Sequence, residues 1–156
     1  MSFEKVSAFF ESAGLGNRVL SLTRSSATVA EAAEAVGCRP EQIAKTLSFF
    51  GAEGPVLIVA AGDARVDNKK FRQAFGVKAR MIPAGEVEEA VGHAPGGVCP
   101  FVIREGVRVF LDRSLRRFEV IYPAAGNAHS AVRLTPDELA ALTGADWTEV
   151  CSVPEP

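Results

Sequence analysis

Apolar and polar positions alternate along the chain with two periods, and this predicts short helices interleaved with short strands. Apolar residues at helical spacing, with capping residues before them and glycines after them, indicate amphipathic helices. The alanine-rich run between Thr28 and Gly37 has such a start and stop, and Thr135-Pro136-Asp137-Glu138 combines a capping box with a proline at the first helical position. The predicted helices cover residues 3–13, 29–36, 41–45, 66–75, 86–91 and 135–142.

Apolar runs bounded by turn residues predict the strands. The runs 47–50 and 55–61 flank Gly51-Ala52-Glu53-Gly54, which indicates a hairpin. Further extended segments are expected at 18–22, 79–82, 101–103, 107–111, 117–122, 131–134 and 147–151. Short turns join most neighbouring strands, so we expect an α+β fold with a mixed, largely antiparallel sheet and flanking helices.

Composition narrows the class of protein. The chain has 156 residues, which we interpret as one domain over 1–156, and 47% hydrophobic content indicates a packed core. No apolar run reaches the length of a bilayer span, and the N-terminal residues lack a signal-peptide pattern, so we expect a cytoplasmic protein that binds no membrane. The formal net charge of −2 argues against a DNA-binding protein but allows local basic clusters, at 69–80 and at 113–117.

Three cysteines and two histidines without metal-ligand spacing give no reason to expect a metal, and no nucleotide-cofactor motif is present. Cys99 could act as a nucleophile, but no neighbour in the sequence would lower the pKa of its thiol.

The segment 92–101, Gly-His-Ala-Pro-Gly-Gly-Val-Cys-Pro-Phe, is the most distinctive in the chain. Its three glycines let backbone amides approach a ligand, while its two prolines restrict the chain. Such a loop can present N–H groups to a carbonyl or an oxyanion, or it can simply connect two elements. Lys45, at the expected junction of a helix and a strand, can likewise meet a phosphate or extend its ammonium into solvent.

These segments together resemble the YbaK/EbsC family of free-standing aminoacyl-tRNA deacylases, which are related to the editing insertion domain of bacterial prolyl-tRNA synthetase. The resemblance runs from about residue 20 to 150. The segments that carry it are 27–33, 42–47, 63–67, 92–101, 109–115 and 125–127. It implies a distorted, partly barrel-like mixed sheet surrounded by helices.

The resemblance also implies a site. Lys45 would touch the terminal adenosine or its phosphate, and Gly96, Gly97 and Pro100 match a loop motif that binds the ester carbonyl through backbone amides. The family usually has glycine directly after the Pro-Phe pair, where this chain has Val102. The remaining residues expected around the substrate are Thr46, His93, Val98, Asn127 and His129. For Asn127 and His129, a turn capped by its own side chains is the alternative.

The implied activity is hydrolysis of the ester of a mischarged tRNA that carries alanine, cysteine, serine or threonine, on tRNA-Pro or a similar tRNA. Such a reaction needs little beyond oxyanion stabilisation and an oriented water, so we expect neither a metal nor a cofactor. The acceptor end of aminoacyl-tRNA is the expected partner, with prolyl-tRNA synthetase or another synthetase as a further candidate. The alternative is a non-catalytic module that binds the tRNA acceptor end or a synthetase.

Overall fold

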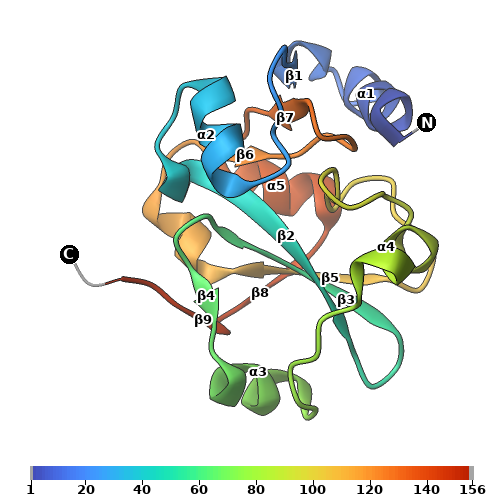
Figure 1. Ribbon diagram of the computed structural model, residues 1–156, viewed down its shortest axis with the longest axis vertical. Helices are drawn as coiled ribbons and strands as arrows, with labels where there is room; N and C mark the ends of the chain where they lie inside the picture. The colour runs from blue at the N-terminus through green and yellow to red at the C-terminus, as the bar shows by residue number, and fades with distance from the viewer. Residues whose placement is uncertain (1, 155–156) are drawn as a thin grey trace.

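A computed structural model describes residues 2–154 and has a mixed α+β architecture (Figure 1). The helices are α1 (Ser2–Ser12), α2 (Val29–Val36), α3 (Asn68–Phe75), α4 (Ala84–Val91) and α5 (Pro136–Thr143). Short 3₁₀ turns are η1 (Gly16–Arg18), η2 (Pro40–Gln42) and η3 (Arg113–Arg117). No helix of this described part is long and apolar enough to cross a membrane.

The strands form one five-stranded sheet and two small ladders. The large sheet has the order β6-β2-β3-β5-β8, and the ladders pair β1 with β7 and β4 with β9. The strands are β1 (Val19–Ser21), β2 (Ile43–Phe50), β3 (Pro55–Ala61), β4 (Arg65–Val66), β5 (Arg108–Asp112), β6 (Tyr122–Pro123), β7 (Ser130–Val132), β8 (Asp146–Thr148) and β9 (Cys151–Ser152). The predicted mixed sheet with surrounding helices is confirmed.

The direction of the strands differs from the largely antiparallel pattern that we expected for the sheet. Only β2 and β3 pair antiparallel in the large sheet, whereas the pairs β2–β6, β3–β5 and β5–β8 are parallel. The reason is that β5, β6 and β8 are joined to their neighbours by long connections rather than by hairpins, and a parallel pair requires such a connection.

The β2–β3 hairpin is the centre of the molecule and confirms the predicted turn. Its register places Lys45 opposite Ala60 and Phe50 opposite Pro55. Residues 56–61 of β3 are at most 3% exposed, because helices or neighbouring strands cover both faces of this strand. The main core therefore forms around β3, and β2 contributes Ala44 and Phe49 to it.

The helix boundaries follow the capping residues that the sequence indicated. The Thr28 hydroxyl accepts a hydrogen bond from Glu31 N at 3.2 Å, and Thr135 with Glu138 forms a complete capping box. Gly37 and Gly144 end α2 and α5 in the left-handed conformation. Local signals of this kind are sufficient where a short-range hydrogen bond defines the helix end.

Four predicted elements are wrong. The helix expected at 41–45 is the turn η2 followed by β2, because Ile43 already pairs with Tyr122. The segment 101–103 forms no strand, since Val102 has a φ of +51° that breaks extended structure. The segment 79–82 makes one isolated bridge, from Met81 to Phe49, and 117–122 contributes only the beginning of β6.

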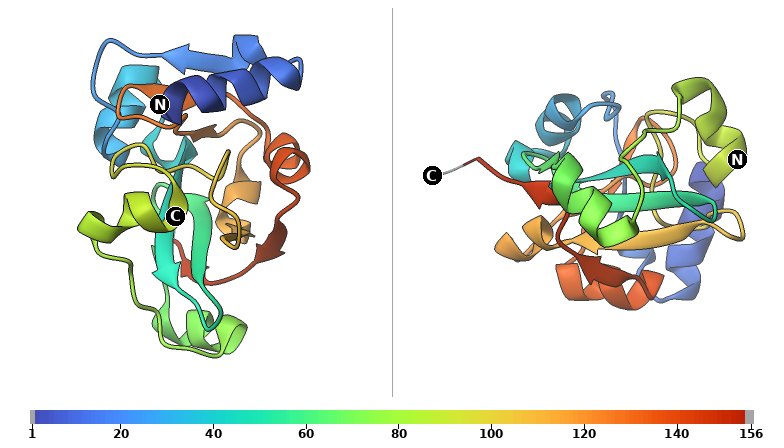
Figure 2. Two further views of the ribbon diagram at one scale, coloured as in Figure 1. Left: turned by 90° about the vertical axis from the view of Figure 1, so that its right-hand side faces the viewer. Right: turned by 90° about the horizontal axis from the view of Figure 1, so that it is seen from below.

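The two ends of the molecule differ in character. Figures 1 and 2 show α1 beside the β1–β7 ladder at one end and α3 at the opposite end, with the large sheet between them. Helix α1 packs Phe9 and Phe10 against Phe101, with ring centroids 5.9 Å and 4.8 Å from that ring. The N-terminal helix thus supports the end of the glycine-rich loop.

Candidate functional site

A pocket of about 270 Å³ opens beside β2, between α2, the β7 region and the glycine-rich loop. Its wall is made largely of small apolar side chains, with hydroxyl groups and one lysine. The lining residues are Ser26, Ala27, Thr28, Val29, Ala32, Ile43, Ala44, Lys45, Thr46, Leu47, Gly96, Val98, Tyr122, Ala124, Ser130 and Ala131. Lys45 and two loop residues, distant in the sequence, therefore face one cavity.

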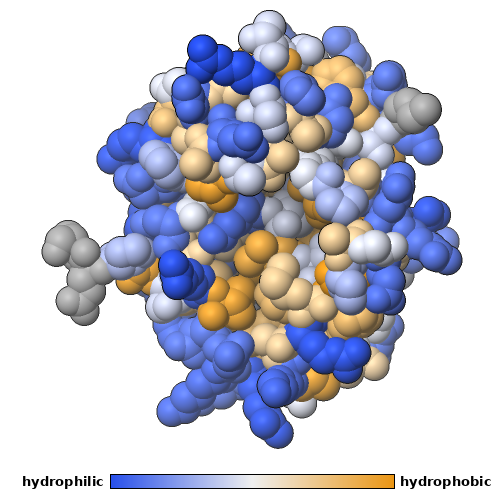
Figure 3. Space-filling view, viewed as in Figure 1, coloured by the Kyte–Doolittle hydropathy of each residue, from blue (hydrophilic) through white to orange (hydrophobic). Residues whose placement is uncertain are grey.

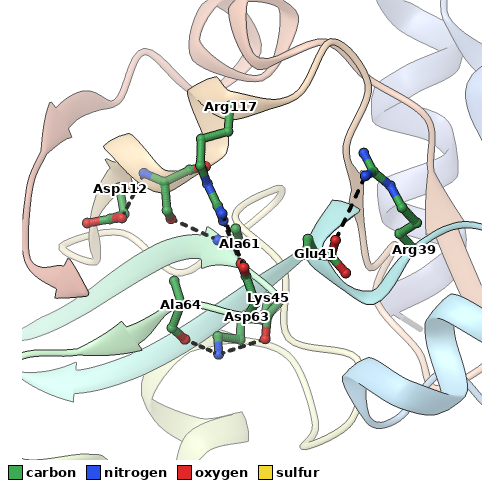
Figure 4. Close-up of polar contacts among 10 residues, drawn as sticks. Arg39, Glu41, Lys45, Ala61, Asp63, Ala64, Asp112 and Arg117 are labelled. Carbon is green, nitrogen blue, oxygen red and sulfur yellow. Dashed lines mark hydrogen bonds and ion pairs between the residues drawn. The ribbon is translucent and has the colours of Figure 1, made fainter. Parts of the chain in front are cut away.

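Lys45 lies in the middle of β2, and its ammonium group is held by backbone oxygens. Nζ donates to the carbonyl oxygen of Ala64 and, at 3.3 Å, to that of Gly62 (Figure 4). The side chain is half-buried, and burial lowers the pKa of Lys45 below its ordinary value. These contacts orient the cation at the edge of the pocket instead of leaving it free in solvent.

An ion pair behind Lys45 fixes the turn that supplies these oxygens. The guanidinium of Arg117 binds both carboxylate oxygens of Asp63, one of them at 3.1 Å, and Arg117 Nε donates to Ser114 O at 2.9 Å (Figure 4). The hydrogen bond from Arg117 holds the pKa of Asp63 below its usual value. Because bidentate pairs restrict geometry, Arg117 and Asp63 position the turn around Lys45.

The loop residues Gly96 and Gly97 have different surroundings. Gly96 lines the pocket and has a φ of +88°, a conformation that strongly favours glycine. Gly97 packs against the backbone of another turn: a Cβ there would lie 2.5 Å from Asn127 Cα. Its N–H donates to Ala94 O at 3.1 Å, while in the described residues the N–H groups of Gly96 and Val98 have no protein acceptor. Gly96 and Val98 are therefore loop residues that line the pocket and whose N–H groups have no acceptor in the described part of the chain.

His93 lies behind the loop and not in the pocket. It is 1% exposed, and its Nε2 is 2.7 Å from the carbonyl oxygen of Phe101, so the ring is a donor through Nε2–H. Within residues 2–154, Nδ1 has no hydrogen-bond partner. Burial lowers the pKa of His93, which keeps the imidazole neutral at pH 7. The residue that we expected near the substrate thus connects the two ends of the loop.

Cys99 is also turned into the interior. Its Sγ lies 3.5 Å from His93 Nε2 and 3.7 Å from Phe101 O, and burial raises the pKa of its thiol to about 12. A thiol of this kind is protonated at neutral pH, and the thiolate is the nucleophilic form. The geometry gives no support to a Cys99 nucleophile.

The other expected residues divide between the pocket and its surroundings. Thr46 and Val98 line the pocket, and in the described part of the chain the buried Thr46 Oγ1 has no partner. Pro100 is buried and borders a different cavity. Asn127 Oδ1 accepts from His129 N at 2.9 Å, and His129 is exposed, so this turn is capped by its own side chain beside Gly97.

Sequence reasoning missed the residues that complete the wall. Ser26 and Ser130 hold two segments together: Ser130 N donates to Ser26 Oγ at 3.0 Å, and Ser26 Oγ donates to Ser130 O at 3.1 Å. Neither serine belongs to a motif, and only tertiary pairing brings them together across 104 positions. The Asp63–Arg117 pair joins residues 54 positions apart and likewise carries no spacing signal.

The mixed sheet therefore places Lys45 and the loop residues Gly96 and Val98 around one small pocket. The chain belongs to the aminoacyl-tRNA editing domain family, whose model matches residues 23–142. The match begins just after β1 and covers every residue that lines the pocket. Members of this family act on aminoacyl-tRNA.

Relatives in sequence agree with this family. The chain is 49% identical over 154 residues to "Uncharacterized protein YwhH" of Bacillus subtilis (strain 168), covering 97% of this chain and 98% of that protein. It is 28% identical over 120 residues to "Putative Cys-tRNA(Pro)/Cys-tRNA(Cys) deacylase EbsC" of Enterococcus faecalis, covering 76% and 73%. A "Proline--tRNA ligase" of Limosilactobacillus fermentum is 30% identical over 95 residues, 57% of this chain and 17% of that protein.

Solved structures extend the similarity to the fold. The "Crystal structure of a putative trans-editing enzyme for prolyl tRNA synthetase" has a TM-score of 0.87 at 35% identity, with 97% of both chains covered. The "Crystal structure of hypothetical protein APE2540" has a TM-score of 0.86 at 31% identity, covering 95% of this chain and 99% of that one. The resemblance found in the sequence segments is therefore confirmed at the level of family and fold.

Proposed function

We propose that this protein hydrolyses the ester that joins a wrong, small amino acid to the 3′ end of a tRNA, in the cytoplasm and without a metal ion. Membership of the editing family supports the reaction class. The observation that carries the proposal is the meeting of Lys45 with Gly96 and Val98 at one pocket. Unpaired backbone amides can stabilise the negative charge that develops on an ester carbonyl oxygen. A cation beside them can bind the phosphate of the terminal nucleotide.

The chemistry follows from what an aminoacyl ester needs. Water attacks the carbonyl carbon and gives up a proton, and the carbonyl oxygen becomes negatively charged. The bond between the carbonyl carbon and the ribose oxygen then breaks, and the ribose oxygen leaves as a hydroxyl after it takes up a proton. Removing one oxyanion donor from an enzyme typically costs about 2.7–4 kcal/mol of transition-state stabilisation. The N–H groups of Gly96 and Val98 can supply such donors, and the rigid loop means that they need no reorganisation during the reaction. Lys45 would bind the terminal nucleotide and align the ester with these amides.

The size of the pocket supports a small amino acid. Alanine side chains 27, 32, 44, 124 and 131 form much of its wall, and about 270 Å³ must accommodate the amino acid and part of the ribose. Alanine, cysteine, serine and threonine fit this limit. Thr46 Oγ1, buried and unpartnered among the described residues, offers one hydrogen bond to a polar side chain or to the amino group.

The identity of the tRNA rests on relatives. The deacylase of E. faecalis carries Cys-tRNA(Pro) in its printed name, and the family includes part of a proline–tRNA ligase. We therefore propose tRNA-Pro as the substrate tRNA and prolyl-tRNA synthetase as a partner. Within residues 2–154, no three side chains of His, Cys, Asp or Glu are grouped as metal ligands.

The test is release of amino acid from purified Ala-, Cys-, Ser-, Thr- and Pro-tRNA-Pro. At least one of the four mischarged esters should be hydrolysed faster with protein than in buffer, before and after dialysis against EDTA, while Pro-tRNA-Pro is spared. Tight binding of the same tRNAs without release of any amino acid would support the non-catalytic alternative instead.

A further inference from the structure

The segment 65–81, which contains β4, α3 and the chain up to Met81, has a strong excess of positive charge. It carries six basic residues and one acidic residue, Asp67. The basic residues are Arg65, Lys69, Lys70, Arg72, Lys78 and Arg80. Asp67 is the N-cap of α3, and its Oδ1 accepts from Lys70 N at 3.0 Å. We name the six basic side chains the α3 basic surface.

No residue of the α3 basic surface forms an ion pair within residues 2–154. The other arginine cluster differs, because each of its members has an acidic partner. Arg113 lies 3.7 Å from Glu149, Arg116 lies 3.4 Å from Asp137, and Arg117 binds Asp63. Two clusters that look alike in the sequence are therefore different in the fold: one is paired with carboxylates, and in residues 2–154 the other is not.

Packing of α3 directs its charges outward. Phe71 is fully buried, with ring centroids 4.9 Å from Phe49 and 4.7 Å from Phe75. Lys69 and Arg72 occupy exposed positions on the same helix. Figure 3 shows hydrophilic side chains gathered at the end of the molecule where Figure 1 places α3.

The α3 basic surface begins next to the backbone turn that holds Lys45. Arg65 follows Ala64, whose carbonyl oxygen accepts the hydrogen bond from Lys45 Nζ. Lys70 Nζ donates to Cys151 O at 3.1 Å, and Cys151 pairs with Val66 of β4. The basic residues thus begin one position after the turn that binds Lys45 and continue along the chain through β4 into α3, which Figure 1 shows directly after β4.

We propose that the α3 basic surface binds the phosphate backbone of the RNA whose 3′ end enters the pocket. This inference rests on the proposed function and adds to it the path of the RNA across the protein. The segment carries a formal charge of +5 in a chain with a total of −2, so the other residues carry −7. Because the rest of the chain carries net negative charge, the electrostatic field favours the approach of a polyanion at this surface and therefore favours one orientation of the RNA.

The test compares two double variants that remove the same charge from exposed positions. Lys69→Gln/Arg72→Gln changes the α3 basic surface, and Arg113→Gln/Arg116→Gln changes the paired cluster. The probe is uncharged tRNA-Pro, with the Kd measured by fluorescence anisotropy over a range of salt concentrations. The first variant should bind about tenfold more weakly at low salt, and the slope of log K against log salt should decrease by roughly 1–2. The second variant should stay within about twofold of the unmodified protein.

Two further readouts separate this inference from the proposed function. In Lys69→Gln/Arg72→Gln, the KM for mischarged tRNA should rise while kcat and the hydrolysis of a 3′-aminoacyl-adenosine stay unchanged. Equal losses of tRNA affinity in both double variants would overturn the inference. An unchanged Kd in Lys69→Gln/Arg72→Gln would also overturn it, and would point to an acidic protein surface as the ligand of the α3 basic surface. Failure of the unmodified protein to release any amino acid, with tRNA binding still dependent on Lys69 and Arg72, would overturn the proposed function alone.

Discussion

The imidazole of His93 and the carbonyl oxygen of Phe101 are joined by a 2.7 Å hydrogen bond that spans the glycine-rich loop. His93 stands near the beginning of the loop, Phe101 at its end, and Gly96 and Val98 between them line the pocket. Both joined residues are almost completely buried, at 1% exposure each. The hydrogen bond therefore holds the loop amides at a fixed position relative to the pocket, and His93 acts as a positioning residue.

Replacing His93 with phenylalanine removes the donor and keeps a ring of similar size. It leaves Phe101 O with only the weak donor of the Cys99 thiol, so the free energy of unfolding should fall by about 1–3 kcal/mol. Movement of the loop should lower kcat about tenfold with little change in KM, because the amides act mainly in the transition state. Steady-state kinetics well below the melting temperature would measure both constants.

His93→Gln is the matched control, because its amide can donate from nearly the same position as Nε2. It should recover most of the kcat that His93→Phe loses. If the two variants lose equal activity, or if His93→Phe keeps full kcat, the hydrogen bond does not position the loop.

Burial of neutral His93 also makes stability depend on pH. Its pKa is lowered in the folded protein, so below the ordinary value of about 6.5 the unfolded chain takes up a proton that the folded protein does not. The free energy of unfolding should therefore decrease as the pH falls from about 7.5 to 5.5. Urea denaturation across this range should give a shallower pH dependence for His93→Gln, and an identical dependence would show that His93 titrates normally.

Val102 occupies a backbone conformation that suits glycine. Its φ is +51°, and a left-handed conformation costs a residue with a side chain about 1–2 kcal/mol. This explains why the resemblance implies glycine at this position. Val102→Gly should raise the melting temperature by about 1–4 °C, after the entropic cost of glycine is subtracted. Val107→Gly is the control: φ is not positive at this position, so the substitution should lower the melting temperature. A lower melting temperature for Val102→Gly would show that the backbone at Val102 is not strained.

A further prediction concerns Cys99 as a possible nucleophile of a thiol enzyme. Since its thiol is buried and its pKa is raised to about 12, alkylation of the folded protein should leave activity intact. Cys99→Ser should keep kcat within about threefold, because the hydroxyl can donate to Phe101 O in place of the thiol. Loss of activity in Cys99→Ser with an unchanged melting temperature would return Cys99 to the mechanism.

The sequence predicted what local interactions decide. Thr28, Thr135 and the glycines that follow α2 and α5 defined those helices, and Gly51 to Gly54 defined the hairpin. The prediction failed where pairing between distant segments determines the secondary structure. Ile43 is an example, because its pairing with Tyr122 brings it into the sheet and places Lys45 in a strand.

The difference between local and distant interactions also explains which residues of the site could be predicted. Lys45, Thr46, Gly96 and Val98 were predicted, and they line one pocket. His93 was placed near the substrate because of its position in the loop, but its contact with Phe101 turns it inward. The two basic clusters were equivalent in sequence, and only the positions of Asp63, Asp137 and Glu149 separate them.

The most direct test of the central claim is deacylation of a mischarged tRNA-Pro by Lys45→Met under single-turnover conditions. Methionine keeps the length of the side chain but removes the charge and its hydrogen bonds, so the rate should fall about 10- to 100-fold while the protein stays folded. Lys5→Met, at an exposed position of α1, should keep the full rate. A Lys45→Met protein as fast as the unmodified one would contradict the assignment of this pocket as the site of hydrolysis.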